Sequence, residues 1–309
     1  MTEKKAEMSQ AMKEKLAPKQ FVKTPINGTK FTILVSSAKG GVGKSTVAIN
    51  LAFALQNLGL KIGILDADVY GPSLPKLINL NEKPKSEDGK ALIPLEKYDA
   101  QCMSMGFLVD EQTPMIWRGP MVISALKTMT QKVLWKDRDV IIVDMPPGTG
   151  DTQLTFAQEV KVDGAIIVST PQDLALLDVK RGIQMFDKTG VKILGLIDNM
   201  SFFKGDDGKE YKIFGEGGVE KTAKEFNKEF LGHLPLHQDL RNATDKGDPL
   251  THSQPDHEVS KLFKGIAEKI KQSCAIPKEE LLKSAEELLK VAGTEAIDQQ
   301  YLTKISKLV

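Results

Sequence analysis

The sequence predicts an α/β protein in which helices cover both faces of a mostly parallel, twisted sheet. Runs rich in Val, Ile and Leu recur along the chain and alternate with amphipathic stretches, a pattern typical of parallel strands buried on both faces. Apolar residues make up 41% and charged residues 27% of the chain, the balance of an ordinary globular protein. The 309 residues suffice for one large domain of this class or for two small ones.

The predicted elements begin after a polar, Lys-rich arm. Strand 31–37 leads through a glycine-rich turn into a helix over 45–57, which Gly59 ends, and strand 60–68 follows. The later predicted strands cover 139–146, 163–170, 191–200 and 230–236.

A further helix is predicted after residue 171, where apolar residues recur at helical spacing. The polar stretches 81–90 and 204–210 predict surface loops. After Cys274, a stripe of leucines predicts helices that either pack against the protein or contact a partner. The predicted organisation is an arm over 1–28, a domain over 29–273 and a helical extension over 274–309.

Charge and cysteine usage exclude several classes of protein. Lys and Arg number 42 against 41 Asp and Glu, so no overall charge favours nucleic acid. No apolar run is long enough to span a bilayer, and the charged N-terminus lacks the apolar segment of a secretory signal. Only Cys102 and Cys274 occur, which argues against a disulfide framework. We therefore expect a cytoplasmic protein with no membrane or nucleic-acid partner.

The glycine-rich turn reads AKGGVGKST and lies between a predicted strand and a predicted helix. Glycines let the backbone fold so that its N–H groups point at phosphate oxygens, and the helix N-terminus adds a positive dipole end. Lys44 can reach the β- and γ-phosphates, and the Ser45 hydroxyl can ligate Mg²⁺. This order of elements predicts a P-loop NTPase. The predicted ATP-binding residues here are Ala38, Lys39, Gly40, Gly41, Val42, Gly43, Lys44, Ser45 and Thr46.

An additional lysine, Lys39, precedes the glycines, while Ala38 replaces the usual first glycine. The pattern K-G-G-x-G-K-[ST] resembles the deviant Walker A class, which includes the nitrogenase iron protein, MinD, partition ATPases and arsenite-pump ATPases. The resemblance implies a homodimer in which Lys39 reaches the partner's phosphates, as an arginine finger does.

Carboxylates follow two of the predicted strands. Asp66 and Asp68 end strand 60–68, and Asp144 ends an apolar strand in a Walker B arrangement, which predicts Mg²⁺ binding by Asp66 and Asp144. By resemblance to related ATPases, Asp68 positions the attacking water; a turn or capping role for either member of the first pair is the alternative. Asn199 ends strand 191–200, and in the resembling ATPases an Asn here hydrogen-bonds adenine.

Five further blocks resemble the Mrp family of iron–sulfur cluster carrier ATPases. The blocks are DADVYGPSLP, TPMIWRGPMV, DMPPGTGDTQLT, TPQDLALLD and IFGEGG, in the family's order between about residues 30 and 255. The resemblance implies a [4Fe–4S] cluster as cargo and apoprotein clients or iron–sulfur assembly proteins as partners.

One departure bears on that cargo. Family members place a Cys-x-x-Cys after the Asn-Met-Ser segment, but this chain has no cysteine between residues 199 and 215. Cys102 is expected to pack inside as a small apolar residue. Cys274, His233 and His237 offer other donors, so the cluster ligands stay unknown.

Three functions remain open at this stage. The first is an ATPase that carries or transfers iron–sulfur clusters. The second is a nucleotide-gated interaction switch that binds no cluster. The third, disfavoured by the balanced charge, is a membrane or DNA partition ATPase.

Overall fold

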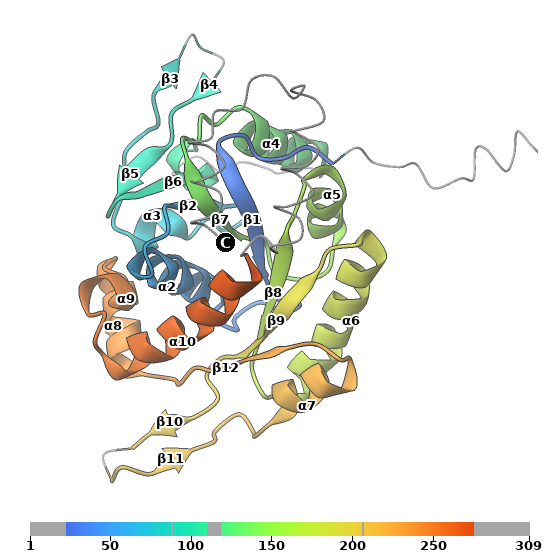
Figure 1. The fold of residues 1–309 in the computed structure, drawn as a ribbon, viewed down its shortest axis with the longest axis vertical. Coiled ribbons are helices and arrows are strands. Elements are labelled where there is room, and N and C mark those ends of the chain that lie inside the picture. The colour runs from blue at the N-terminus through green and yellow to red at the C-terminus, as the bar shows by residue number, and fades with distance from the viewer. Residues whose placement is uncertain (1–22, 88, 90, 110–118, 206, 275–309) are drawn as a thin grey trace, which may run out of the picture. The chain divides into compact units, whose positions relative to one another are not determined.

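The computed structural model describes residues 23–87, 89, 91–109, 119–205 and 207–274 (Figure 1). The chain divides into two units, Met1–Ala267 and Glu268–Val309. The first unit contains the sheet and all the site residues discussed below. Of the second unit, only residues 268–274 are described, at the end of helix α10 (Glu258–Ser273). The predicted extension over 274–309 therefore lies outside the described residues, apart from Cys274.

An eight-stranded sheet forms the centre of the first unit, in the order β12-β9-β8-β1-β7-β2-β6-β5. All neighbours pair in parallel except β5 and β6, which are antiparallel. The strands are β1 (Thr29–Ser36), β2 (Ile62–Asp66), β5 (Leu95–Lys97), β6 (Ala100–Ser104), β7 (Arg138–Asp144), β8 (Gly164–Ser169), β9 (Ile193–Asp198) and β12 (Phe230–His233). The predicted mostly parallel α/β fold is confirmed.

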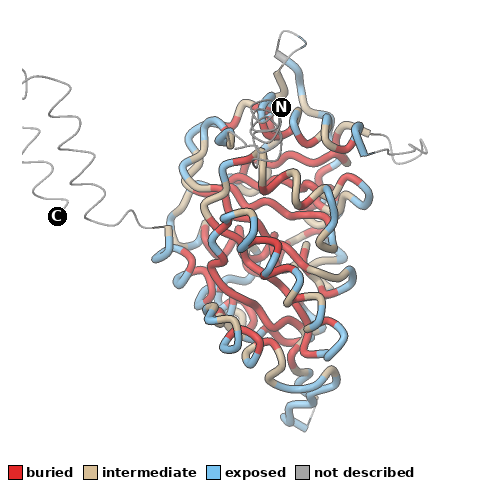
Figure 2. Tube along the Cα trace, turned by 90° about the vertical axis from the view of Figure 1, so that its right-hand side faces the viewer, coloured by how far each residue is buried: buried red, intermediate tan, exposed pale blue. Residues whose placement is uncertain are grey.

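The helices along the sheet form two rows, and within each row neighbouring helices contact one another (Figure 1). One row contains α2 (Lys44–Asn57), α3 (Leu74–Leu77), α8 (Gln238–Lys246) and α9 (Leu250–Ser253). The other contains α4 (Gly119–Gln131), α5 (Asp151–Glu159), α6 (Asp173–Thr189) and α7 (Gly218–Glu225). The central strands β2 and β8 are buried over their whole length, whereas β1 and β7 are buried only over their carboxyl-terminal five residues. Buried segments are red in Figure 2.

The topology brings the carboxyl ends of distant strands to one edge of the sheet. From β1 the chain moves outward to β2 and β6, returns to β7, and then crosses β1 to β8 and β9. Asp144 is in register with both Val35 and Asp66, and Ser169 is in register with Asp198. The order reverses beside β1, and open α/β sheets bind ligands in the crevice at such a point.

The predicted boundaries differ from the observed ones by a few residues. The predicted helix 45–57 starts at Lys44, and strand 60–68 is shortened to Ile62–Asp66. Strands β5 and β6 were not predicted. Strand β5 has only three residues, and the stretch QCMSMGFL, which contains most of β6, has no β-branched residue and no alternation.

Both predicted polar loops contain small antiparallel pairs. Ser86–Glu87 (β3) pairs with Ala91–Leu92 (β4), and Phe203–Lys204 (β10) pairs with Glu210–Tyr211 (β11). Among the described residues, no helix is both long and apolar enough to cross a membrane.

The described end of the predicted arm is attached to the sheet domain. Thr24 forms a parallel bridge with Val160, and Ile26 is buried. Residues 1–22 lie outside the described residues, as do residues 113–118 of the block TPMIWRGPMV.

Candidate active site

The glycine-rich turn between β1 and α2 has the backbone that a phosphate loop requires. Gly41 and Gly43 have φ angles of 81° and 78°, in the left-handed region that a residue without a Cβ adopts readily. A Cβ on Gly43 would lie 2.4 Å from Asn199 Nδ2. Gly43 is also the N-cap of α2, and no side chain caps this helix. The first N–H groups of α2 therefore point from an uncapped N-terminus, a ready site for an anion.

Lys44 and Asp144 form a buried ion pair below this turn. Lys44 Nζ lies 2.5 Å from Asp144 Oδ1 and 3.2 Å from Ser45 Oγ, and the two charged side chains are 6% and 2% exposed. Burial raises the pKa of Asp144, while the charge and hydrogen bond of Lys44 act to lower it. The structure thus brings together three predicted residues, two from the start of α2 and one from the end of β7.

Asp66 is buried beside them and has both carboxylate oxygens engaged. Oδ1 accepts from Asp68 N at 3.1 Å; Oδ2 accepts from Ser73 N at 2.9 Å, Leu74 N at 3.0 Å and Ser104 Oγ at 3.0 Å. Burial, followed by the negative charge of Asp144, raises the pKa of Asp66 to about 7. Asp66 therefore has the turn and capping geometry that the sequence offered as the alternative to Mg²⁺ binding.

Asp68 lines a cleft of about 470 Å³ together with Tyr70, Pro146, Pro147 and Gln153. Its Oδ1 accepts from Gly71 N at 3.3 Å, which leaves the carboxylate half-exposed at the mouth of the site. Asp68 is thus the member of the predicted pair that faces an open space.

The segment that follows Asp144 is tied to the phosphate loop. Met145 N donates to Val35 O at 3.0 Å, and Gly148 N donates to Ser37 O at 2.9 Å. A movement of this segment would therefore be transmitted to the end of β1, as a segment that senses the γ-phosphate requires.

Gln153 was missed as a site residue by sequence reasoning. It is 1% exposed, and its Oε1 accepts from Ser36 Oγ at 2.9 Å while its Nε2 donates to Pro146 O at 2.5 Å. It therefore links α5 to both the end of β1 and the start of the segment after Asp144. Residue spacing could have indicated that Gln153 is buried, because positions 153, 156 and 157 share the buried face of one helix.

Asn199 lies against the phosphate loop. Its Nδ2 donates to Val42 O at 2.8 Å, and its backbone N–H donates to Ser169 O at 2.8 Å. The predicted adenine contact stays a prediction, because this geometry places the side chain beside the loop and shows no base.

The remaining loop residues surround this centre. Lys39 is half-buried, and no ion pair joins it to another residue of the described chain. Ala38, which replaces the usual first glycine, lies close to Gly182 of α6: a Cβ on Gly182 would be 3.8 Å from Ala38 Cβ. The space between them is therefore suited to small residues. Thr46 follows Ser45 in the first turn of α2, and its carbonyl accepts from Asn50 Nδ2 at 2.9 Å.

Among the described residues, Cys102 and His233 lie on strands toward opposite edges of the sheet. Cys102 is buried in β6, as expected for a small apolar residue, and burial raises the pKa of its thiol to about 12. His233 ends β12 at the opposite side of the sheet and pairs with Asp198 at 3.2 Å. Cys102 is therefore not available as a ligand, and a set that combines Cys274 with His233 or His237 stays a prediction.

Residues 28–271 match the family described as the NUBPL iron-transfer P-loop NTPase, of the ParA group. The chain belongs to this family. The match covers the whole sheet and the site, so the resemblance to the Mrp carriers drawn from the sequence blocks is confirmed.

Relatives in this family include proteins with assigned functions. The chain is 50% identical over 254 residues to an iron-sulfur cluster transfer protein NUBPL of Dictyostelium discoideum, covering 81% of this chain and 79% of the relative. It is 48% identical over 247 residues to an iron-sulfur cluster carrier protein of Escherichia coli, covering 79% and 67%.

Solved structures agree on the fold. A nucleotide-binding protein of Archaeoglobus fulgidus, in complex with ADP and with cobalt, is 36% identical with a TM-score of 0.64, covering 72% of this chain and 88% of the other. The cell division ATPase MinD of Pyrococcus furiosus has a TM-score of 0.57 at 21% identity, covering 78% and 98%, and shows the fold alone.

Proposed function

We propose that this protein is a dimeric, Mg²⁺-dependent ATPase that carries or transfers iron–sulfur clusters to apoproteins. The observation that carries the proposal is the buried Lys44–Asp144 pair under an uncapped glycine turn. It occurs in a chain half identical to a cluster transfer protein. The relatives' names support the cargo, and the site supports the nucleotide chemistry.

The proposed reaction is in-line hydrolysis of ATP to ADP and phosphate. Phosphate oxygens at the turn would compete with Asp144 for the Lys44 ammonium, so that nucleotide binding loosens the ion pair. Asp68 would orient the water from the cleft, and Asn199 would contact adenine. Lys39 would reach the partner's phosphates across the dimer.

Oxygen donors for Mg²⁺ are present next to Lys44. Ser45 Oγ and the Asp144 carboxylate are hard ligands that fit this ion, which when bound neutralises charge on the β- and γ-phosphates. Both carboxylate oxygens of Asp66 accept hydrogen bonds from the protein, so we place Asp66 behind these ligands, where burial and the negative charge of Asp144 raise its pKa.

A second candidate is a nucleotide-gated switch that binds no cluster. One observation favours it: the segment after Asn199 forms the β10–β11 hairpin and contains no cysteine. As a carrier, this chain would have to hold its cluster through ligands outside that segment. In either case we propose a cytoplasmic homodimer that acts on protein partners and needs no nucleic acid or membrane.

Anaerobic reconstitution with iron and sulfide distinguishes the two candidates. Iron would be counted, and the visible spectrum recorded, for the wild type and for a Cys102→Ser/Cys274→Ser double variant. We expect about four irons per dimer, the content of one [4Fe–4S] cluster, and none in the variant. A wild type without iron or sulfide would contradict the carrier proposal and leave the switch.

A further inference from the structure

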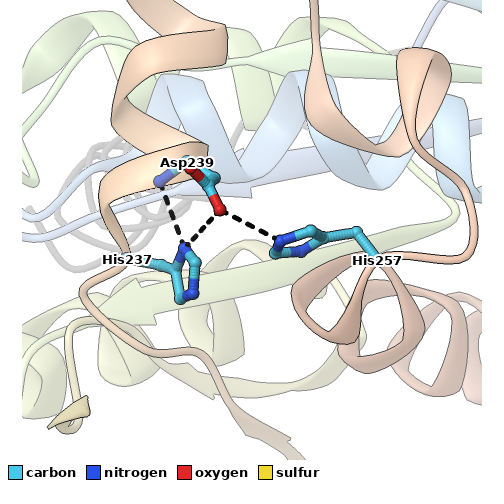
Figure 3. Close-up of side chains that lie close together, drawn as sticks. All are labelled: His237, Asp239 and His257. Atoms are coloured by element: carbon cyan, nitrogen blue, oxygen red, sulfur yellow. Dashed lines mark hydrogen bonds and ion pairs between the residues drawn. The ribbon is translucent and has the colours of Figure 1, made fainter. Parts of the chain in front are cut away.

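Two histidines and a carboxylate form a group at the start of two helices. His237 is the N-cap of α8, Asp239 is in the first turn of the same helix, and His257 directly precedes α10 (Figure 3). The side chains point toward one another in Figure 3. We propose that this group, the His237–Asp239–His257 cluster, is a binding site for a divalent transition metal ion such as Zn²⁺.

The donor atoms are spaced as a metal ion would require. His257 Nε2 lies 3.3 Å and His237 Nδ1 lies 3.8 Å from Asp239 Oδ2. One ligand atom from each residue lies within 4.8 Å of the other two. Ligand atoms that lie about 2.0–2.2 Å from a tetrahedral ion are closer to one another than 4.8 Å. Small side-chain rotations would therefore bring all three donor atoms to one ion.

The donor types select the class of ion. Two imidazoles and one carboxylate suit Zn²⁺, Co²⁺ or Ni²⁺, whereas Mg²⁺ prefers oxygen ligands alone. The histidine side chains are 20% and 17% exposed and that of Asp239 is 54% exposed. An ion can therefore enter from solvent, and water would fill the remaining coordination positions.

Contacts behind His237 favour this use. His237 Nε2 lies 3.3 Å from Glu258 Oε1, so a proton on Nε2 directs the Nδ1 lone pair toward the cluster. A carboxylate behind a ligating imidazole in this way fixes its orientation and raises its basicity.

Metal binding would break two hydrogen bonds that cap helices. Asp239 N donates to His237 Nδ1 at 3.1 Å, and Val259 N donates to His257 Nδ1 at 3.2 Å. An ion at His237 Nδ1 replaces the first bond. An ion at His257 Nε2 moves the imidazole proton to Nδ1 and so removes the second. Without metal binding, the same cluster would be a capping and ion-pair network that joins the starts of α8 and α10.

The test is titration of the full-length, chelator-treated protein with Zn²⁺ and Co²⁺. The variants are His237→Asn and His257→Asn, because the Asn side-chain oxygen can still accept the capping N–H while the imidazole is lost. His233→Asn is the matched control, because His233 is an exposed histidine that also contacts a carboxylate but lies outside the cluster.

We expect one Zn²⁺ per wild-type chain and a rise in melting temperature on binding. Each cluster variant should weaken the affinity by at least about tenfold and lose the rise, while the control keeps both. Bound Co²⁺ should show visible absorption without the near-ultraviolet band of a thiolate ligand, which excludes the cysteines. No saturable binding by the wild type, or wild-type affinity in both cluster variants, would overturn the proposal in favour of the capping network.

Discussion

At the scale of single residues, Gln153 shows how a buried amide connects the parts of the site. Its two hydrogen bonds join Ser36, at the end of β1, to Pro146, in the segment that follows Asp144. A leucine of similar size would leave the Ser36 hydroxyl and the Pro146 carbonyl buried without these partners, and each unsatisfied group costs about 1–3 kcal/mol.

We therefore predict that Gln153→Leu lowers ATP turnover on the order of 10²-fold, because the segment after Asp144 loses its alignment. Nucleotide affinity should change little, since the glycine turn and Lys44 do not contact Gln153. Phosphate release and equilibrium binding of a labelled nucleotide would measure the two effects separately. Gln131→Leu, at an exposed position at the end of α4, is the matched control. Unchanged turnover in Gln153→Leu would show that this linkage has no part in catalysis.

Which side chains form the site could be predicted only in part from the sequence. Lys44, Ser45 and Asp144 follow from a local motif and from an apolar strand that ends in a carboxylate. The contacts of Gln153 with Ser36 and of Asn199 with Val42 join residues 117 and 157 positions apart. Such contacts depend on strand order, which local patterns do not encode.

At the scale of elements, Asp66 holds three parts of the fold together. It ends β2, accepts the first N–H groups of α3 and accepts the hydroxyl of Ser104 at the end of β6. Strand β6 was not predicted, because residues 100–104 show no alternation and both faces of the strand are buried. The capping role of Asp66 was predicted only as the alternative to Mg²⁺ binding.

The protonation of Asp66 predicts a pH dependence of stability. Its pKa rises from 3.8 to about 7 in the folded protein, so between these values the native state holds a proton that the unfolded chain has lost. The free energy of unfolding should therefore fall as pH rises from about 4 to about 7. Asp66→Asn, which cannot ionise, should remove this part of the slope.

Urea unfolding over that pH range measures the slope directly. The exposed residue Asp256 provides the control Asp256→Asn, which should keep the wild-type slope. An Asp66→Asn variant with the same slope as the wild type would mean that Asp66 is ionised in the native state at neutral pH.

At the scale of the whole molecule, the proposed dimer predicts that two inactive variants restore each other. Lys39→Ala should bind nucleotide but lose turnover, and Lys44→Ala should lose nucleotide binding. In a mixed dimer, the Lys44→Ala chain supplies an intact Lys39 to the site of the Lys39→Ala chain, so that one of the two sites becomes complete.

Mixing the purified variants should therefore recover part of the wild-type phosphate release, at most about half per mixed dimer because one site in two is complete. Lys192→Ala, at an exposed position outside the loop, is the control and should retain full activity. Wild-type turnover by Lys39→Ala alone, or no recovery on mixing, would contradict a role for Lys39 across a dimer.

The overall architecture followed from the sequence more fully than the dimer or the cargo did. Apolar strands separated by helices predicted the mostly parallel sheet, which the strand order confirms. The ligand site at the glycine-rich turn stays a prediction. The family's cysteine pair is absent from residues 199–215, so neither the sequence nor the hairpin found there identifies a cluster ligand.

The most direct test of the central claim is release of phosphate from Mg²⁺-ATP by the wild type and by Lys44→Ala. Loss of Lys44 leaves Asp144 buried without its cation, but the raised pKa of this carboxyl allows it to take up a proton and limits the cost to folding. Lys30→Ala, which breaks an exposed pair with Asp139, controls for the loss of a lysine, and circular dichroism checks the fold. We predict turnover by the wild type and Lys30→Ala and none by folded Lys44→Ala; equal turnover by all three would place the ATPase site elsewhere.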